Sequence, residues 1–210
     1  MLTLAIGFET RATVDGKLAT RFVKVTHGMP SDESFLNRLK AGEPAAYAML
    51  VERFEGPLYR FFLCDHRNHH TAQEQTAETF AQLVRSFGGM RGGCEQLRAY
   101  VFATARHVQL RRWRDHRKQP SSLAEAINVN DPRPSPVALA SDREQLERAL
   151  NAIGQLEEQA RHVLLLRFVE GCSVDEVAVA LELPVGTVKS HIHRGRLRLK
   201  EILSEKEYKK

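Results

Sequence analysis

The 210-residue sequence contains only three cysteines, and no two of them have the C-x-x-C spacing of a redox or zinc site. We expect Cys64, Cys94 and Cys172 to be reduced thiols in a cytoplasmic protein. No apolar run is long enough to cross a membrane, and the first residues lack the charged-then-apolar order of a signal peptide. These absences argue against a disulfide-stapled secreted protein and predict no membrane insertion.

Signatures of catalysis are also scarce. The glycine-rich segment at residues 88–93, "GGMRGG", lacks the flanking strand and the Lys-Ser/Thr pair of a phosphate-binding loop. Asp65, His66, His69 and His70 lie close together, which raises the hypothesis of a metal site or a metal-dependent nuclease. A catalytic metal needs ligands that converge from more than one element, and no second set is evident, so we favour a structural loop. We expect no enzymatic activity, no cofactor and no metal.

What the sequence does contain is a strongly basic segment near its end. Residues 183–203, "LPVGTVKSHIHRGRLRLKEIL", repeat apolar side chains at helical spacing, namely Val188, Ile192, Leu199 and Leu203. Lysine, arginine and histidine fill much of the remaining surface. The net charge of the whole chain is +5, which is compatible with a nucleic-acid partner. The segment is therefore predicted to be an amphipathic helix with a basic face.

The residues before this helix complete a helix-turn-helix pattern. Ser173 and Glu176 form a predicted capping box that opens a short helix, and only a short turn separates that helix from the basic one. In this motif the second helix enters the DNA major groove. The side chains expected to face DNA are Thr187, Lys189, Ser190, His191, Arg194 and Arg196. His191 also raises the hypothesis of pH-dependent binding, against the simpler interpretation of a shorter polar contact.

The predicted fold class is all-α, with two small helical domains joined by a flexible linker and a helix-turn-helix in the second. The first domain spans residues 31–118 and the second spans 141–205, where Ser141 and Glu144 cap the opening helix. The proline-containing residues 119–140 form the linker. Residues 1–30 alternate apolar and polar side chains around Asp15-Gly16. They are either an added hairpin or an annotation artefact, with translation beginning at Met29.

Within the first domain, apolar spacing predicts several buried helices. Pro57 is expected to kink or interrupt the second of them, and Thr71 with Glu74 suggests a capping box for the next. That next helix is expected to bury Phe80, Leu83, Val84 and Phe87. The last helix, at residues 95–118, is basic and is expected to bury Leu97, Val101, Val108 and Trp113.

Several of these segments together resemble the extracytoplasmic-function group of bacterial RNA polymerase sigma factors, in the sigma-70 family. The resemblance covers about residues 31–203. It is carried by "LVERFEGPLYRFF" at 50–62, "AETF" at 77–80, "ARHVQLRRWR" at 105–114, and the long segment 156–203.

The resemblance implies two points of DNA contact and a polymerase partner. The first domain would dock on the clamp helices of the polymerase beta-prime subunit through Glu74, Glu78 and Gln82. It would hold the melted minus-ten strand through Arg91, Arg106, His107, Arg111, Arg112 and Arg114. The second domain would bind the beta flap and read the minus-thirty-five element. An anti-sigma protein is a further partner that the resemblance implies, although no residue reports one.

The sequence departs from the family pattern at three places. "TAQE" at 71–74 replaces an acidic "DAED", His107 and Arg111 replace an Asn and an Asp, and His191 replaces an Arg. These changes predict an unusual promoter and fewer carboxylates for the clamp. Two alternatives remain open: a stand-alone helix-turn-helix regulator that binds duplex DNA, and the metal-dependent nuclease.

Overall fold

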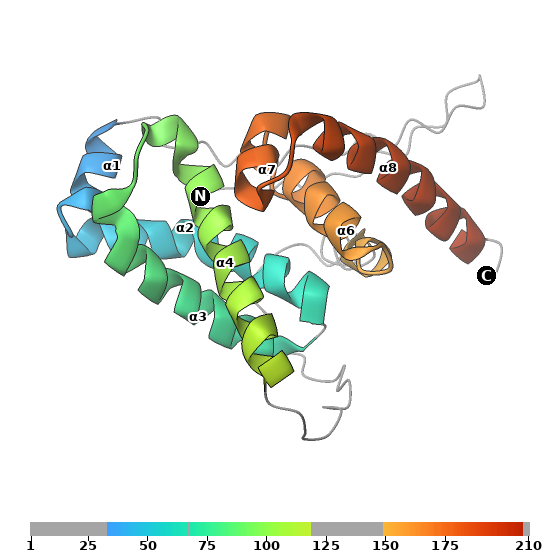
Figure 1. Cartoon of the computed structure of the whole chain (residues 1–210), viewed down its shortest axis with the longest axis horizontal. Coiled ribbons are helices and arrows are strands. Elements are labelled where there is room, and N and C mark those ends of the chain that lie inside the picture. The colour runs from blue at the N-terminus through green and yellow to red at the C-terminus, as the bar shows by residue number, and fades with distance from the viewer. Residues whose placement is uncertain (1–32, 67, 119–148, 208–210) are drawn as a thin grey trace.

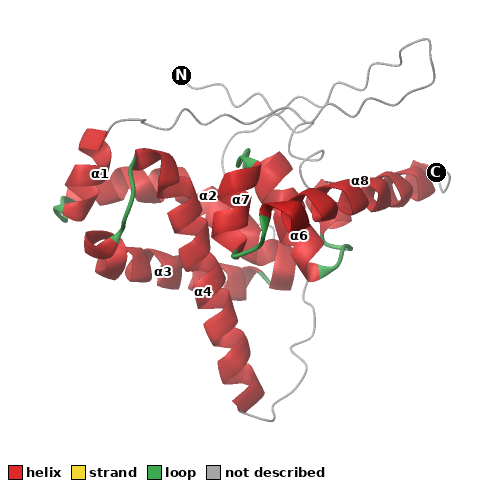
Figure 2. Cartoon of the chain, turned by 45° about the horizontal axis from the view of Figure 1, so that its top comes forward, coloured by secondary structure: helices red, strands yellow, loops and turns green. Residues whose placement is uncertain are grey.

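The computed structural model describes residues 33–66, 68–118 and 149–207, and in these ranges it contains helices and no strands (Figure 1, Figure 2). The predicted all-α class is confirmed. The leader at 1–30, the linker at 119–140 and the predicted cap at Ser141 lie outside the described residues. None of the described helices combines the length and apolarity that a membrane crossing requires.

The first half consists of four α-helices and two short 3₁₀ turns. These are α1 (Glu33–Lys40), α2 (Pro44–His66), α3 (His69–Ser86), η1 (Phe87–Gly89), η2 (Cys94–Gln96) and α4 (Leu97–Lys118). Aromatic rings fill the space between α2 and α4, with the Phe61 ring centroid 5.9 Å from that of Phe102 and Phe54 edge-on to Phe102 at 6.4 Å. Such contacts add to the burial of apolar surface. They fix α4 against α2.

Two predictions about local structure in this half need correction. Helix α2 continues through Pro57, so the expected interruption is absent. Helix α3 begins at His69, where Asn68 is the N-cap and its side-chain oxygen accepts a hydrogen bond from the Thr71 backbone N–H at 3.0 Å. The expected capping box of Thr71 and Glu74 is therefore absent. Asparagine is as good a cap as threonine, and it lies three residues earlier.

The buried face of α3 is also more polar than predicted. Val84 is 55% exposed, whereas Thr76 and Thr79 are buried. The two hydroxyl groups donate to the carbonyls of Ala72 and Gln75, one turn back, at 2.8 and 2.7 Å. A threonine whose hydroxyl is hydrogen-bonded to the backbone of its own helix can be buried with its methyl group among apolar side chains. A prediction that counts only apolar residues therefore misidentifies the buried face of α3.

The second half contains the predicted helix-turn-helix. Residues 149–153 are helical and are followed by α6 (Glu158–Leu164), the π-helical turn η3 (Leu165–Val169), α7 (Val174–Leu181) and α8 (Val185–Glu207). The capping box at the start of α7 is confirmed, with Glu176 N–H to Ser173 Oγ at 3.1 Å and Ser173 N–H to Glu176 Oε2 at 2.6 Å. Glu182 makes the turn in a left-handed conformation with φ of 54°.

The two halves pack against each other through α4 with α7 and α2 with α6 (Figure 1). Their buried apolar side chains belong to one continuous core. The Phe61 ring, for example, contacts Phe102 of its own half and His162 of the other, the latter at a centroid distance of 4.6 Å. The described residues thus form two helical units with a shared, well-packed boundary.

Candidate nucleic-acid interface

Helix α8 is held on the second half by a narrow buried stripe. The stripe repeats every three or four residues and consists of Val188, His191, Gly195, Leu199 and Ile202. A Cβ atom on Gly195 would lie 2.6 Å from Leu164 Cδ1, closer than carbon atoms approach. A glycine at this position therefore lets α8 lie close to α6, which fixes the direction of the opposite, solvent-facing side.

The solvent-facing side of α8 carries several exposed cations. Lys189, Arg194 and Arg196 are exposed, and none of them pairs with a carboxylate among the described residues. Thr187 is half-buried beside them, and Ser190 is exposed with its hydroxyl donating to the Gly186 carbonyl at 3.0 Å. Unpaired cations retain their full attraction for phosphate, so this surface suits a nucleic acid.

His191 does not lie on this surface. Its side chain is only 7% exposed and belongs to the buried stripe. The reason is helical spacing, because residue 191 follows Val188 by three positions and precedes Gly195 by four. The prediction that His191 contacts DNA, and the pH hypothesis built on that contact, do not fit its position.

On the basic helix α4, two of the cations expected to bind DNA are paired with carboxylates of α3. Arg112 contacts Glu74 of α3 at 3.0 Å, and Arg111 lies 3.7 Å from Glu78. Arg114 donates from Nε to the carbonyl of Leu110 at 3.3 Å. These pairs place the residues expected to bind polymerase directly beside those expected to bind the minus-ten strand.

The remaining residues expected at these two sites lie at the surface. Arg91 is exposed on the loop between η1 and η2, and Gln82 is half-buried on α3, where its side-chain oxygen accepts from Arg85 at 3.1 Å. Trp113, expected in the core, is 38% exposed.

The loop between η1 and η2 is anchored rather than loose. Met90 is buried, and the Cys94 backbone N–H donates to Glu33 Oε1 of α1 at 2.9 Å. The Tyr100 hydroxyl donates to the Ser86 carbonyl at 3.0 Å, and its ring packs on Phe87 at 5.6 Å. Four glycines predict a flexible segment, but these contacts hold both of its ends.

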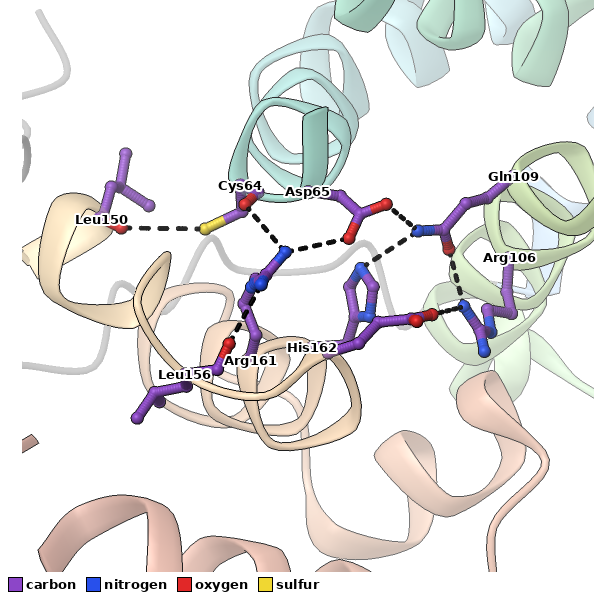
Figure 3. Close-up of polar contacts among 9 residues, drawn as sticks. Cys64, Asp65, Arg106, Gln109, Leu150, Leu156, Arg161 and His162 are labelled. Atoms are coloured by element: carbon purple, nitrogen blue, oxygen red, sulfur yellow. Dashed lines mark hydrogen bonds and ion pairs between the residues drawn. The ribbon is translucent and has the colours of Figure 1, made fainter. Parts of the chain in front are cut away.

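A polar cluster between the two halves is the feature that sequence reasoning missed (Figure 3). Asp65 at the end of α2 accepts from Arg161 of α6 at 3.0 Å and from the Gln109 amide of α4 at 2.6 Å, with its side chain 4% exposed. The amide also lies 3.4 Å from His162 Nε2. The signal was present, because Asp65 follows Leu58 and Phe61 at the spacing of the buried stripe of α2.

The partners of Asp65 shown above are Arg161 and Gln109, not the histidines at 66, 69 and 70 with which a metal site was considered. The Tyr59 hydroxyl is hydrogen-bonded to His69, and His70 lies 3.1 Å from Glu74. Within the described residues, no three histidine, cysteine or acidic side chains are grouped so as to hold a metal ion. The geometry gives no support to the metal-site hypothesis.

Further contacts join α4 and α2 to the second half. Arg106 contacts Glu158 at 2.9 Å and His107 lies 3.4 Å from Glu182. Arg60 of α2 makes a two-point contact with Glu170, at 2.7 and 2.9 Å. Bidentate pairs of this kind combine strength with a fixed geometry. Two of the predicted minus-ten residues, Arg106 and His107, thus face carboxylates of the other half.

Comparison with known proteins relates both halves to one class. Residues 146–199 match the family described as "Sigma-70, region 4". The chain is 27% identical over 174 residues to the RNA polymerase sigma-H factor of Pseudomonas aeruginosa, covering 79% of this chain and 90% of that one. It is 24% identical over 171 residues to the ECF RNA polymerase sigma factor BldN of Streptomyces coelicolor, covering 81% of this chain and 65% of that one.

A solved structure has a similar fold. The sigma factor RpoE of Bartonella quintana, solved in complex with the anti-sigma factor NepR, aligns with a TM-score of 0.58 and 22% identity. The alignment covers 75% of this chain and 96% of that one. The likeness extends over both helical halves.

Proposed function

Because the chain belongs to the extracytoplasmic-function group of the sigma-70 family, we propose that it binds core RNA polymerase and directs promoter-specific initiation of transcription. It acts by binding and carries out no reaction of its own. Its partners are promoter DNA and core polymerase. We therefore expect it to act in the cytoplasm, at the nucleoid. As with the relatives solved in complex with anti-sigma proteins, such a protein is a natural third partner.

The observation that carries the proposal is the exposed face of α8. Lys189, Arg194 and Arg196 have no carboxylate partner among the described residues, and a helix-turn-helix whose second helix exposes such cations is suited to enter a major groove. We assign the minus-thirty-five element to the domain at 141–205, with contacts from Thr187, Lys189, Ser190, Arg194 and Arg196. The C-terminal part of α8 extends away from the other helices in both views (Figure 1, Figure 2).

The domain at 31–118 supplies the second contact. We assign the binding of the polymerase clamp helices to α3, through Glu74, Glu78 and Gln82. We assign the binding of the polymerase beta flap to the domain at 141–205. The minus-ten strand is assigned to the neighbouring loop and α4, through Arg91, Arg106, His107, Arg111, Arg112 and Arg114. The support is their arrangement, because α3 and α4 lie side by side with their charged side chains in contact.

Transcription in vitro tests the proposal. Purified core polymerase from the source organism is incubated with genomic DNA fragments, with and without this protein, and the new transcript starts are sequenced. Starts that share two upstream motifs at fixed spacing are the expected result. Retained duplex binding without any protein-dependent start contradicts it, and points to a stand-alone regulator.

The role of α8 has its own prediction. Replacing Lys189 or Arg194 with Ala should weaken binding to the promoter duplex and reduce the slope of log affinity against log salt by about one for each lost phosphate contact. Lys40→Ala, which removes an exposed charge at the end of α1, is the control and should leave the slope unchanged. An equal loss in all three variants would show a general charge effect and remove α8 from the site.

A further inference from the structure

Helix α3 has a polar buried face, which distinguishes it from the helix α2 beside it. The buried side chains of α3 are Thr71, Ala72, Gln75, Thr76, Thr79 and Leu83. Those of α2 include the large apolar groups Leu50, Phe54, Leu58, Phe61 and Phe62. Burial of apolar area is the main favourable contribution to packing, and it grows with the area buried. Helix α3 therefore gains less from its contacts than α2 does.

Gln75 fits this buried face poorly. Its side chain is 2% exposed, and neither Nε2 nor Oε1 has a hydrogen-bond partner among the described residues. Gln109 of α4 is as deeply buried, yet its Nε2 donates to Asp65 at 2.6 Å and its Oε1 accepts from Arg106 at 2.9 Å. A buried amide without partners has lost its hydrogen bonds to water and gained none in exchange. Gln75 thus opposes the packed position of α3.

The other polar contacts of α3 hold its middle only weakly. Thr76 and Thr79 donate to carbonyls of α3 itself, so their hydroxyl groups make no bond to a neighbouring helix. The two ion pairs from α3 to α4 involve carboxylates that are 46% exposed, and exposed pairs contribute little. The ends are held better, through the Asn68 cap and through Phe87 packed on Tyr100.

Helix α3 also lies outside the contact between the two halves. It packs chiefly on α2, α4 and η1, whereas α2 and α4 themselves pack on the second half (Figure 1, Figure 2). Loss of its contacts would therefore leave the boundary between the halves in place. Elements with few buried apolar contacts open at a lower free energy than the rest of a protein.

We propose that α3 is a weakly held element that opens locally in the free protein while α2, α4 and the second half stay folded, and that polymerase bound on its outer side holds it closed. The second part rests on the proposed function, in which Glu74, Glu78 and Gln82 of α3 bind core polymerase. A partner that binds only the closed form reduces opening by one plus the ratio of its free concentration to its Kd. Docking then stabilises a helix that the free chain holds weakly.

Hydrogen–deuterium exchange of the full chain under native conditions, followed by mass spectrometry, measures this opening. Peptides from α3 should exchange at least about tenfold faster than peptides from the buried parts of α2 and α4. Gln75→Met replaces the unpartnered amide by an unbranched apolar side chain, and should slow exchange in α3 by about tenfold. The control is Gln73→Met, the same substitution at an exposed position of α3, which should change exchange by less than about twofold.

Either of two results overturns the inference. The first is exchange in α3 that is no faster than in α2 and α4. The second is exchange in Gln75→Met that is as fast as in the control or faster, because the amide would then have a partner in solution. Far-ultraviolet circular dichroism confirms that each variant is folded, and Gln75→Leu, which is also apolar, takes the place of Gln75→Met if that variant is not.

The same measurement with core polymerase tests the second part of the proposal. Polymerase at a free concentration of about a hundred times its Kd should slow exchange in α3 by about a hundredfold. Size-exclusion chromatography confirms that the complex has formed. Exchange in α3 that is as fast in the complex as in the free chain contradicts the assignment of α3 to polymerase. The comparison of the free variants still reports local opening in that case, so the two failures are distinguishable.

Discussion

His162 lies where the two halves meet and is buried in its neutral form. Burial lowers its pKa to about 4, opposed by the Asp65 carboxylate and assisted by the positive charges of Arg106 and Arg161. The Gln109 amide donates toward Nε2 of the ring, which requires that nitrogen to be unprotonated. The ring also packs on Phe61. A charged imidazolium would meet two guanidinium groups and lose an acceptor.

The free energy of unfolding should therefore decrease as the pH falls below 6.5. In that range the unfolded chain binds a proton at His162 and the folded chain does not, so acid favours unfolding, and the loss levels off near pH 4. Its full size is roughly 3 kcal/mol. Urea denaturation at pH 7 and pH 5 checks this. His162→Phe should show a smaller loss between these two values, and an equal loss in both proteins would assign the effect to other groups.

At the scale of single elements, the sequence predicted those helices whose signals are local. The Ser173–Glu176 capping box is an example, since it depends on residues within a few positions of each other. The start of α3 was predicted wrongly because the sequence offers two candidate N-cap residues, Asn68 and Thr71, and the structure uses Asn68. The burial of His191 was missed because a buried polar residue looks like a surface one until its packing partner is known. Partners far apart in sequence, such as Arg60 and Glu170, left no local signal.

The position of α8 depends on one small residue. Gly195→Ala should place a methyl group against Leu164 and push α8 away from α6, with an unfolding free energy lower by about 1 to 3 kcal/mol. Gly186→Ala, in the first turn of the same helix, meets no atom within 4 Å and should be neutral or stabilising by up to about 1 kcal/mol. Thermal denaturation of the two variants checks this. Similar effects in both would show that helix propensity, not packing, determines the result.

At the scale of the whole molecule, the shared core predicts that the described halves unfold together. Phe61 contacts both halves, and the buried ion pairs cross the boundary. A single cooperative transition, coincident by far-ultraviolet circular dichroism and by Trp113 fluorescence, is the expected behaviour. The sequence did not predict which residues lie at this boundary, because they are far apart in the chain and come into contact only when the two halves pack together.

Breaking one buried ion pair between the halves should lower the free energy of unfolding of the whole molecule. Glu170→Ala leaves the Arg60 guanidinium without its bidentate partner and should cost about 3 kcal/mol or more. Arg60→Met combined with Glu170→Leu replaces the pair by apolar groups and should recover most of that loss. Urea denaturation of the three proteins measures the difference. A double variant no more stable than Glu170→Ala would show that the pair itself, rather than the unpaired charge, dominates.

The exposed ion pairs between α3 and α4 have a thermodynamic consequence for the order of assembly. Any partner that takes over the carboxylates of Glu74 and Glu78 releases Arg111 and Arg112 for a second, negatively charged partner. Linkage is reciprocal, so the second partner strengthens the first by the same factor. Each such pair is worth at most about 1 kcal/mol. Under the assignment proposed above, with Glu74 and Glu78 on polymerase and Arg111 and Arg112 on the strand, the protein on polymerase would bind a nucleic-acid strand more tightly than the protein alone.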